Sequence, residues 1–168
     1  MKTFEIDVSG SDIFEKDFTI VVAEENNSNV ILAYKFTEQI SRVILSRHGQ
    51  NLYRYPPSKN GKANLKVRLY CVAIHYIFKE LKKRLKLTDA CLLVCRDFSG
   101  HEPDIQQSLA HLLEEALHIQ LEIVFTRLQK GSIADRYAFL IRKDTHNKFT
   151  KMRILISLEE FEIFMQKK

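Results

Sequence analysis

The feature that most constrains this chain is the order of its strand-like and helix-like segments. The strongest helical pattern lies at residues 62–85, where apolar side chains recur every three or four positions and lysines occupy the other face. Three short strand-like runs precede it, at residues 3–8, 18–23 and 30–36. Turn-forming residues at 24–29 separate the second run from the third, so we expect these runs to form an antiparallel meander.

The second half of the chain contains further strand-like and helix-like segments in alternation. Residues 90–95 form a continuous apolar run, which is typical of a central strand covered on both faces. The remaining predicted elements are helices at 37–46, 103–117 and 133–141, strands at 121–125 and 154–156, an amphipathic end at 158–165 and an exposed loop at 47–61. The order predicts an α/β three-layer fold, with a mixed sheet of five or six strands and helices on both faces.

Length and composition narrow the class of protein. The 168 residues contain no linker-like segment, so we expect a single domain spanning 1–168. No apolar run approaches the roughly 20 residues of a membrane span, and the N-terminus does not resemble a signal peptide. A cytoplasmic protein with no membrane association is therefore expected. Cys71, Cys91 and Cys95 lie in apolar surroundings, which favours reduced thiols, and their spacing argues against a zinc site.

Charge favours a polyanionic partner. The formal net charge is +5 and the isoelectric point is about 9.1. Basic residues concentrate between positions 42 and 84, where Glu80 is the only acid, and again between 127 and 153. This distribution indicates nucleic acid as the partner, bound through its phosphates.

Three aspartates stand where such a fold would bring them together. Asp7 lies in the first strand-like run, Asp97 follows the apolar run 90–95, and Asp135 opens the helix predicted at 133–141. Taken singly, each is more often a turn or capping residue. If they converge, their carboxylates form a site for Mg²⁺ or Mn²⁺, and the expected chemistry is phosphodiester hydrolysis.

Short motifs around these acids carry a family resemblance. They read D-V-S-G at 7–10, C-R-D at 95–97 and A-D-R-Y-A at 134–138. With the element order, they make residues 3–142 resemble the ribonuclease H-like superfamily, which includes ribonucleases H and Holliday-junction resolvases; residues 150–168 would be a C-terminal extension. The resemblance implies three antiparallel strands followed by helix, strand, helix, strand and helix.

The resemblance also implies roles for individual residues. Asp7 would bridge two ions, while Asp97 and Asp135 would each bind one. Asp104 either adds a fourth acid or caps its helix, because Glu80 is poorly placed for that role. The residues expected to contact nucleic acid are Lys62, Lys66, Arg68, Lys130, Arg136 and Arg142.

Several alternatives stay open at this point. The chain could be a ribonuclease H-like module without catalysis, or an unrelated α/β interaction domain in which the acids never meet. Arg136 could pair with Asp135 and compete with metal binding. Phe161, Ile163 and Phe164 could form a homodimer interface, as resolvase-like members act as dimers, or close the core. The substrate could be an RNA/DNA hybrid, branched DNA or a single strand.

Overall fold

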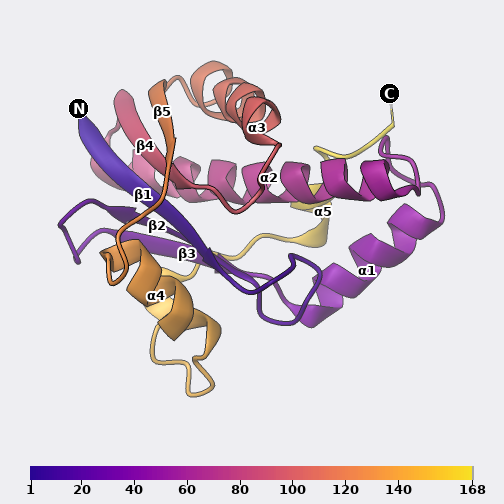
Figure 1. Cartoon of the computed structure of the whole chain (residues 1–168), viewed down its shortest axis with the longest axis horizontal. Helices are drawn as coiled ribbons and strands as arrows, with labels where there is room; N and C mark the ends of the chain where they lie inside the picture. The colour runs from indigo at the N-terminus through magenta and orange to yellow at the C-terminus, as the bar shows by residue number, and fades with distance from the viewer. Residues whose placement is uncertain (168) are drawn as a thin grey trace.

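Alternating side chains build a five-stranded mixed sheet. The computed structural model of the chain describes residues 1–167, and its strands run in the order β3-β2-β1-β4-β5 (Figure 1). The strands β1 (Lys2–Ser9), β2 (Thr19–Glu24) and β3 (Ile31–Lys35) form the predicted antiparallel meander. The strands β4 (Asp89–Cys95) and β5 (Gln120–Thr126) continue the sheet parallel to β1.

The register of β1 and β4 decides which residues meet at the end of the sheet. Ile6 of β1 lies opposite Val94 of β4, and the two strands are parallel. Their carboxyl ends therefore lie at the same edge, with Asp7 and Cys95 as the next residues along each strand.

Helix α2 (Lys59–Leu85) covers one face of the sheet. It begins at Ser58, whose hydroxyl accepts a hydrogen bond from the Gly61 N–H at 3.0 Å, and it ends at Lys86, which has a left-handed backbone. Its apolar side chains share one core with Phe4, Ile6 and the apolar residues of α3 (Glu102–Leu109). The 3.6-residue periodicity that predicted this helix therefore marks its buried face.

Helix α4 (Ile133–Arg142) lies on the opposite face. Its buried residues Ala134, Ala138 and Ile141 pack on Val21 of β2 and Ala33 of β3. Figure 1 shows α2 and α4 on opposite sides of β1, β2 and β3, which confirms that helices cover both faces of the sheet.

Strand β4 differs from its prediction as a strand covered on both faces. Ala90, Leu92 and Val94 are buried on the α2 side, whereas Cys91 and Leu93 are only half-buried on the other. Helix α4 packs mainly on β1 and β2 and does not extend over this part of the sheet. A continuous apolar run cannot reveal this difference, because both faces of the strand carry similar side chains.

The helical segments also differ in detail from prediction. Helix α1 (Glu38–Gly49) extends past its predicted end. The loop between α1 and α2 is shorter than the predicted 47–61, and its Tyr53 is buried with 3% of its surface exposed. Helix α3 continues into a π-helical turn, η1 (Ala110–Glu115). None of the described helices is both long and apolar enough to cross a membrane.

The predicted strand at 154–156 is wrong. After the 3₁₀ turn η2 (Thr150–Met152), the chain makes one bridge to β3, and the Ile154 N–H donates to the Ala33 carbonyl at 2.8 Å. Leu155 is then 90% exposed, whereas Ile156 is buried. The segment leaves the sheet edge to reach the core, so pairing ends after one bridge.

The C-terminal aromatics contribute to the core. Helix α5 (Leu158–Glu162) begins with a capping box between Ser157 and Glu160. Phe161 is fully buried and stacks on Phe36, with ring centroids 5.5 Å apart. Phe164 packs against His75. Two of the three residues considered for a homodimer interface therefore close the core, while Ile163 remains exposed.

Candidate metal centre

Asp7 occupies a nearly buried position on β1. Only 7% of its surface is exposed, and its Oδ1 accepts a hydrogen bond from the Val8 N–H at 2.8 Å. Because side chains alternate along a strand, Asp7 points away from the core that holds Ile6. The alternation of apolar and polar residues at 3–8 predicts this orientation from the sequence alone, and the structure confirms it.

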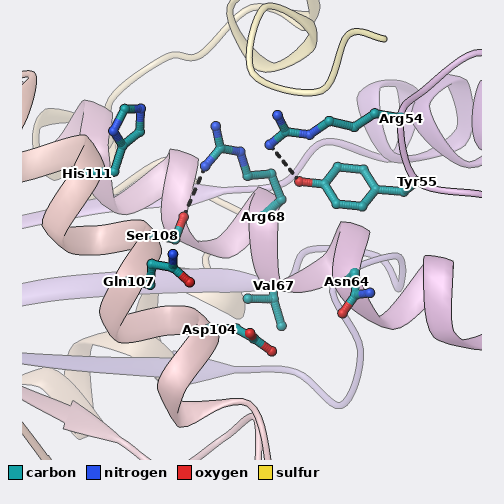
Figure 2. Close-up of a pocket in the computed structure, with 9 residues that line it drawn as sticks. All are labelled: Arg54, Tyr55, Asn64, Val67, Arg68, Asp104, Gln107, Ser108 and His111. Atoms are coloured by element: carbon teal, nitrogen blue, oxygen red, sulfur yellow. Dashed lines mark hydrogen bonds between the residues drawn. The ribbon is translucent and has the colours of Figure 1, made fainter. Parts of the chain in front are cut away.

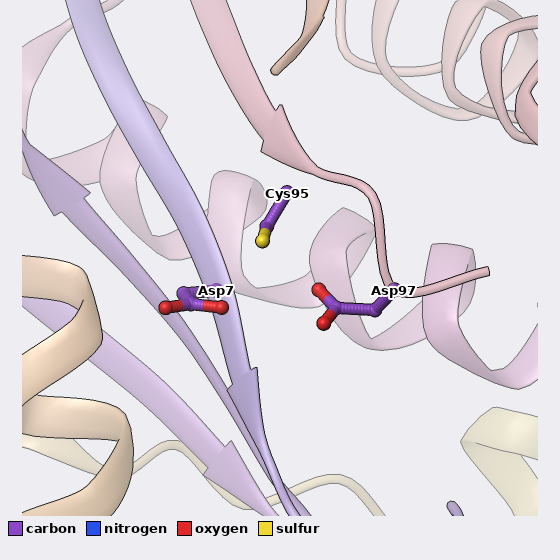
Figure 3. Close-up of side chains that lie close together, drawn as sticks. All are labelled: Asp7, Cys95 and Asp97. Atoms are coloured by element: carbon purple, nitrogen blue, oxygen red, sulfur yellow. The ribbon is translucent and has the colours of Figure 1, made fainter. Parts of the chain in front are cut away.

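Cys95 and Asp97 approach Asp7 from the neighbouring strand. Cys95 is the last residue of β4, and a turn in which the Asp97 N–H donates to the Cys95 carbonyl at 2.9 Å follows it. One oxygen of Asp7, the Cys95 Sγ and one oxygen of Asp97 all lie within 4.8 Å of one another. Figure 3 shows the two carboxylates and the thiol directed toward the same space. Two of the three predicted aspartates, Asp7 and Asp97, therefore converge, and Asp135 is not part of the group.

The surroundings disfavour negative charge at these three groups. Burial is the main cause that raises the pKa of Asp7. Asp97 is an exposed residue, but its carboxylate is partly buried. This burial, followed by the charge of Asp7, raises the pKa of Asp97 to about 6. Burial, followed by the charges of Asp97 and Asp7, raises the pKa of the Cys95 thiol to about 12. A divalent cation would relieve this repulsion, because its positive charge balances the negative charges of both carboxylates.

Tyr70 of α2 adds a buried hydroxyl near the same groups. It is fully buried, its ring lies 4.7 Å from that of Phe98, and its hydroxyl has no hydrogen-bond partner. Burial raises the pKa of Tyr70, and among the nearby charges that of Asp97 raises it most. Unpartnered buried hydroxyls are uncommon, so Tyr70 marks a polar position beside the acids.

Asp135 lies close to this group but outside it. The Ser132 hydroxyl accepts a hydrogen bond from the Asp135 N–H at 3.3 Å, which begins α4. The Asp135 carboxylate accepts from the Gly131 N–H at 2.8 Å, and its charge adds to the burial that raises the pKa of Asp7. Among the described residues no ion pair joins Arg136 to Asp135; the Arg136 guanidinium instead lies 5.9 Å from the Tyr137 ring.

The two other acids considered for a fourth ligand lie elsewhere. Asp104 is in the first turn of α3, with its carboxylate 3.5 Å from the His101 ring and no capping hydrogen bond. Glu80 pairs with Arg84 at 2.9 Å. Neither residue belongs to the group of converging donor atoms.

The sequence pattern contained two signals that were missed. Glu5 is buried two residues before Asp7, on the same side of β1, and burial together with the charges of Glu25 and Asp7 raises its pKa. Cys95 is the last residue of β4, and Asp97 lies in the turn that follows it. Strand alternation predicts the placement of Glu5, whereas the meeting of Cys95 and Asp97 depends on that turn.

Three of the basic residues expected to contact nucleic acid lie along α2. Lys66 pairs with Asp12, and together with Asp97 it lines a cavity of about 380 Å³. The Lys62 ammonium lies 5.8 Å from the Phe14 ring. Arg68 points into a different cleft, between α2 and α3. Of these three residues, Lys66 is therefore the one that shares a cavity with Asp97.

The remaining basic residues lie around α4. The Arg142 Nε lies 3.5 Å from the point where a side chain on Gly10 would begin, just beyond the end of β1. Lys130 lines a cleft that also contains Glu5. Arg136 is exposed. Arg142 therefore lies near the carboxyl end of β1, and Lys130 lies near Glu5.

The chain was compared with known proteins in three ways. It matches no family model, no curated protein and no solved structure.

Proposed function

We propose that this protein is a metal-dependent endonuclease that hydrolyses phosphodiester bonds in an RNA/DNA hybrid or in structured DNA. The observation that carries this proposal is the convergence of Asp7 and Asp97 at the ends of two adjacent parallel strands. Basic side chains on both sides of that edge, Lys66 and Arg142, support a polyanionic substrate.

We further propose that the fold is ribonuclease H-like. Three antiparallel strands are followed by helices, strand, helix, strand and helix, which is the order that the family resemblance implies. The order of strands and helices is the main support for this fold. Three short motifs, at 7–10, 95–97 and 134–138, add a likeness in sequence.

The two carboxylates of the donor set fit Mg²⁺ or Mn²⁺, because both cations accept oxygen ligands. Asp7 and Asp97 would supply carboxylate oxygens, and Cys95 would be a third donor once it loses its proton. A bound ion would activate water and stabilise charge on the phosphoryl oxygens. A two-metal mechanism also requires a ligand for a second ion. Asp135 would supply that ligand if its carboxylate released the hydrogen bond from the Gly131 N–H.

The side chains around the acids have separate tasks in this proposal. Lys66 and Arg142 neutralise phosphates on either side of the scissile bond and hold the strand in register. The buried carboxylate of Asp7 is held by the Val8 N–H, so its position is set before substrate binds. The hydroxyl of Tyr70 supplies a hydrogen bond to a group bound at Asp97.

A module without catalysis is the second candidate. Two observations favour it: Asp135 uses its carboxylate within its own loop, and a thiol stands where a third carboxylate would serve a hard cation better. Such a module would bind nucleic acid through the same basic surface, without a contribution from the acids.

Cleavage assays distinguish the two candidates. Labelled hybrid, duplex, four-way junction and single-stranded substrates would be incubated with Mg²⁺ or Mn²⁺ and the protein or its Asp7→Asn variant. Asp89→Asn is the matched control, because Asp89 begins the same strand that ends at Cys95. Metal-dependent cleavage that is lost only in Asp7→Asn supports the nuclease. Salt-sensitive binding without cleavage, equal in all three proteins, supports the module.

A further inference from the structure

A second polar cleft lies between α2, α3 and the segment that precedes α2. Its volume is about 450 Å³, and none of Asp7, Cys95 and Asp97 lines it. Figure 2 shows the side chains that line it: Arg54, Tyr55, Asn64, Val67, Arg68, Asp104, Gln107, Ser108 and His111. Most of them carry hydrogen-bond donors, so the cleft has the chemistry of an anion site.

Arg68 is held rigidly in this cleft by neutral groups. Its Nε donates to the Phe164 carbonyl at 3.0 Å, and a terminal nitrogen donates to the Ser108 hydroxyl at 3.1 Å. The guanidinium also lies 5.6 Å from the Phe164 ring. Neither partner carries a charge, so the positive charge of Arg68 is partly buried without a carboxylate to balance it.

Arg54 adds a second guanidinium to the same cleft. It donates to the Tyr55 hydroxyl at 3.0 Å and lies 5.2 Å from the Tyr55 ring. Figure 2 shows its guanidinium beside that of Arg68. Burial lowers the pKa of Arg68 and the charge of Arg54 lowers it further, which agrees with their proximity. Among the described residues, neither arginine forms an ion pair with a carboxylate.

The acids around the cleft do not neutralise the arginines. Asp104 is the only acid in the lining, its side chain is mostly exposed, and its near partner is His101. Glu115 pairs with His111 at 2.8 Å and does not line the cleft. Two like charges fixed close together raise the free energy of the folded protein, and a bound anion would lower it.

We propose that this cleft binds the terminal phosphate group of a nucleotide or of a nucleic-acid strand. Guanidinium groups bind phosphate through paired hydrogen bonds, and Asn64 and Gln107 offer further donors for its remaining oxygens. The cleft, at about 450 Å³, leaves room beside the phosphate for further parts of a ligand. The proposal goes beyond the metal centre and holds whether or not the chain cleaves its substrate.

Binding measurements on the full chain test the site. The probes are inorganic phosphate and one short oligonucleotide with and without a 5′-phosphate, titrated at fixed ionic strength by calorimetry. The side-chain N–H resonances of Arg54 and Arg68 report where each probe binds. The variants are Arg54→Gln and Arg68→Gln, with Arg42→Gln as control, because Arg42 is an exposed arginine paired with Glu38 on α1.

The proposal expects the 5′-phosphate to strengthen binding and to shift both arginine resonances. Each cleft variant should weaken phosphate-dependent binding about tenfold, as for a lost hydrogen bond to a charged group, and Arg42→Gln should not. Arg54 is exposed, so Arg54→Gln should keep its fold even if Arg68→Gln does not. Free phosphate that competes with the oligonucleotide shows that the phosphate itself is recognised; binding of the phosphorylated oligonucleotide alone shows that the nucleotide is also needed.

Other results would overturn the proposal. These are equal affinity for the two oligonucleotides, phosphate-dependent binding that survives in Arg54→Gln, or no shift of either arginine resonance. A phosphoserine peptide that binds more tightly than the phosphorylated oligonucleotide would also overturn it, since the cleft would then serve a protein partner.

Discussion

The Cys95 thiol lies beside both carboxylates, with its Sγ within 4.8 Å of one oxygen of Asp7 and of one oxygen of Asp97. Burial disfavours negative charge at all three groups, and the charge of Asp7 adds to this effect at Cys95 and Asp97. A cluster of this kind lowers the stability of the protein in the absence of a cation, and this cost is measurable separately from activity.

Asp7→Asn should therefore stabilise the protein while it removes metal binding. The substitution deletes a nearly buried charge whose pKa is raised mainly by burial. We expect a midpoint of thermal unfolding higher by roughly 2–4 °C without metal, and loss of the further stabilisation by Mn²⁺. Calorimetric scans with and without Mn²⁺ check both effects. A lower midpoint with Mn²⁺ stabilisation intact would mean that Asp7 is purely structural.

Asp97 should make stability depend on pH. The pKa of Asp97 is about 6 in the folded protein, whereas the usual value for an aspartate is 3.8. The folded protein therefore holds this proton more tightly than the unfolded chain does. Protonated Asp97 makes its full contribution to the free energy of unfolding below about pH 4, and this contribution is lost as the pH rises through about 6. Urea unfolding between these limits, in metal-free buffer, should show a smaller decline for Asp97→Asn than for the native chain. Parallel profiles would contradict this expectation.

Cys95 should influence which cation binds. A sulfur donor favours Mn²⁺ over Mg²⁺, because Mg²⁺ prefers oxygen ligands. Cys95→Ser should reduce the ratio of Mn²⁺ to Mg²⁺ affinity, measured by competition titration above pH 7. Cys91→Ser is the control, since Cys91 lies on the same side of β4 but outside the donor group. The same loss in both variants would show that sulfur is not a ligand.

Two buried tyrosines should respond differently to loss of the hydroxyl. The Tyr70 hydroxyl has no partner, whereas that of Tyr53 donates to Glu162 at 2.8 Å. Tyr53→Phe should cost about 0.5–1.5 kcal/mol in the free energy of unfolding, and Tyr70→Phe should cost nothing. If the Tyr70 hydroxyl acts at the metal centre, Tyr70→Phe should lower the rate of cleavage while the free energy of unfolding stays unchanged. Denaturant unfolding and a cleavage assay on the same preparations separate these effects.

Gly61 should be indispensable to the start of α2. A Cβ atom there would lie 1.8 Å from the Pro56 carbonyl oxygen. Gly61→Ala should lower the free energy of unfolding by at least about 2 kcal/mol, because the backbone must move. Gly49 has open space around it, so Gly49→Ala should raise the free energy of unfolding by about 0.5–1 kcal/mol. Chemical denaturation of both variants tests the contrast.

Local patterns predicted most of the elements because they depend on neighbouring residues. The meander, α2, β4, β5 and α4 all lie close to their predicted positions. The failures occur where the rest of the molecule decides: residues 154–156 leave the sheet to bury Ile156, and Tyr53 enters the core from a predicted exposed loop. Neither outcome has a signal within a few residues of the segment.

By itself, the sequence determined that Asp7 points away from the core of Ile6 and that Asp97 follows a buried strand, since period-two alternation is a local property. Only the tertiary structure decided that β1 and β4 pair in parallel with Ile6 opposite Val94, which brings Cys95 between the acids. It also decided that Asp135 is engaged by the loop before α4. Strand pairing and helix placement follow from packing of the whole core, so residues distant in sequence meet only when that core forms.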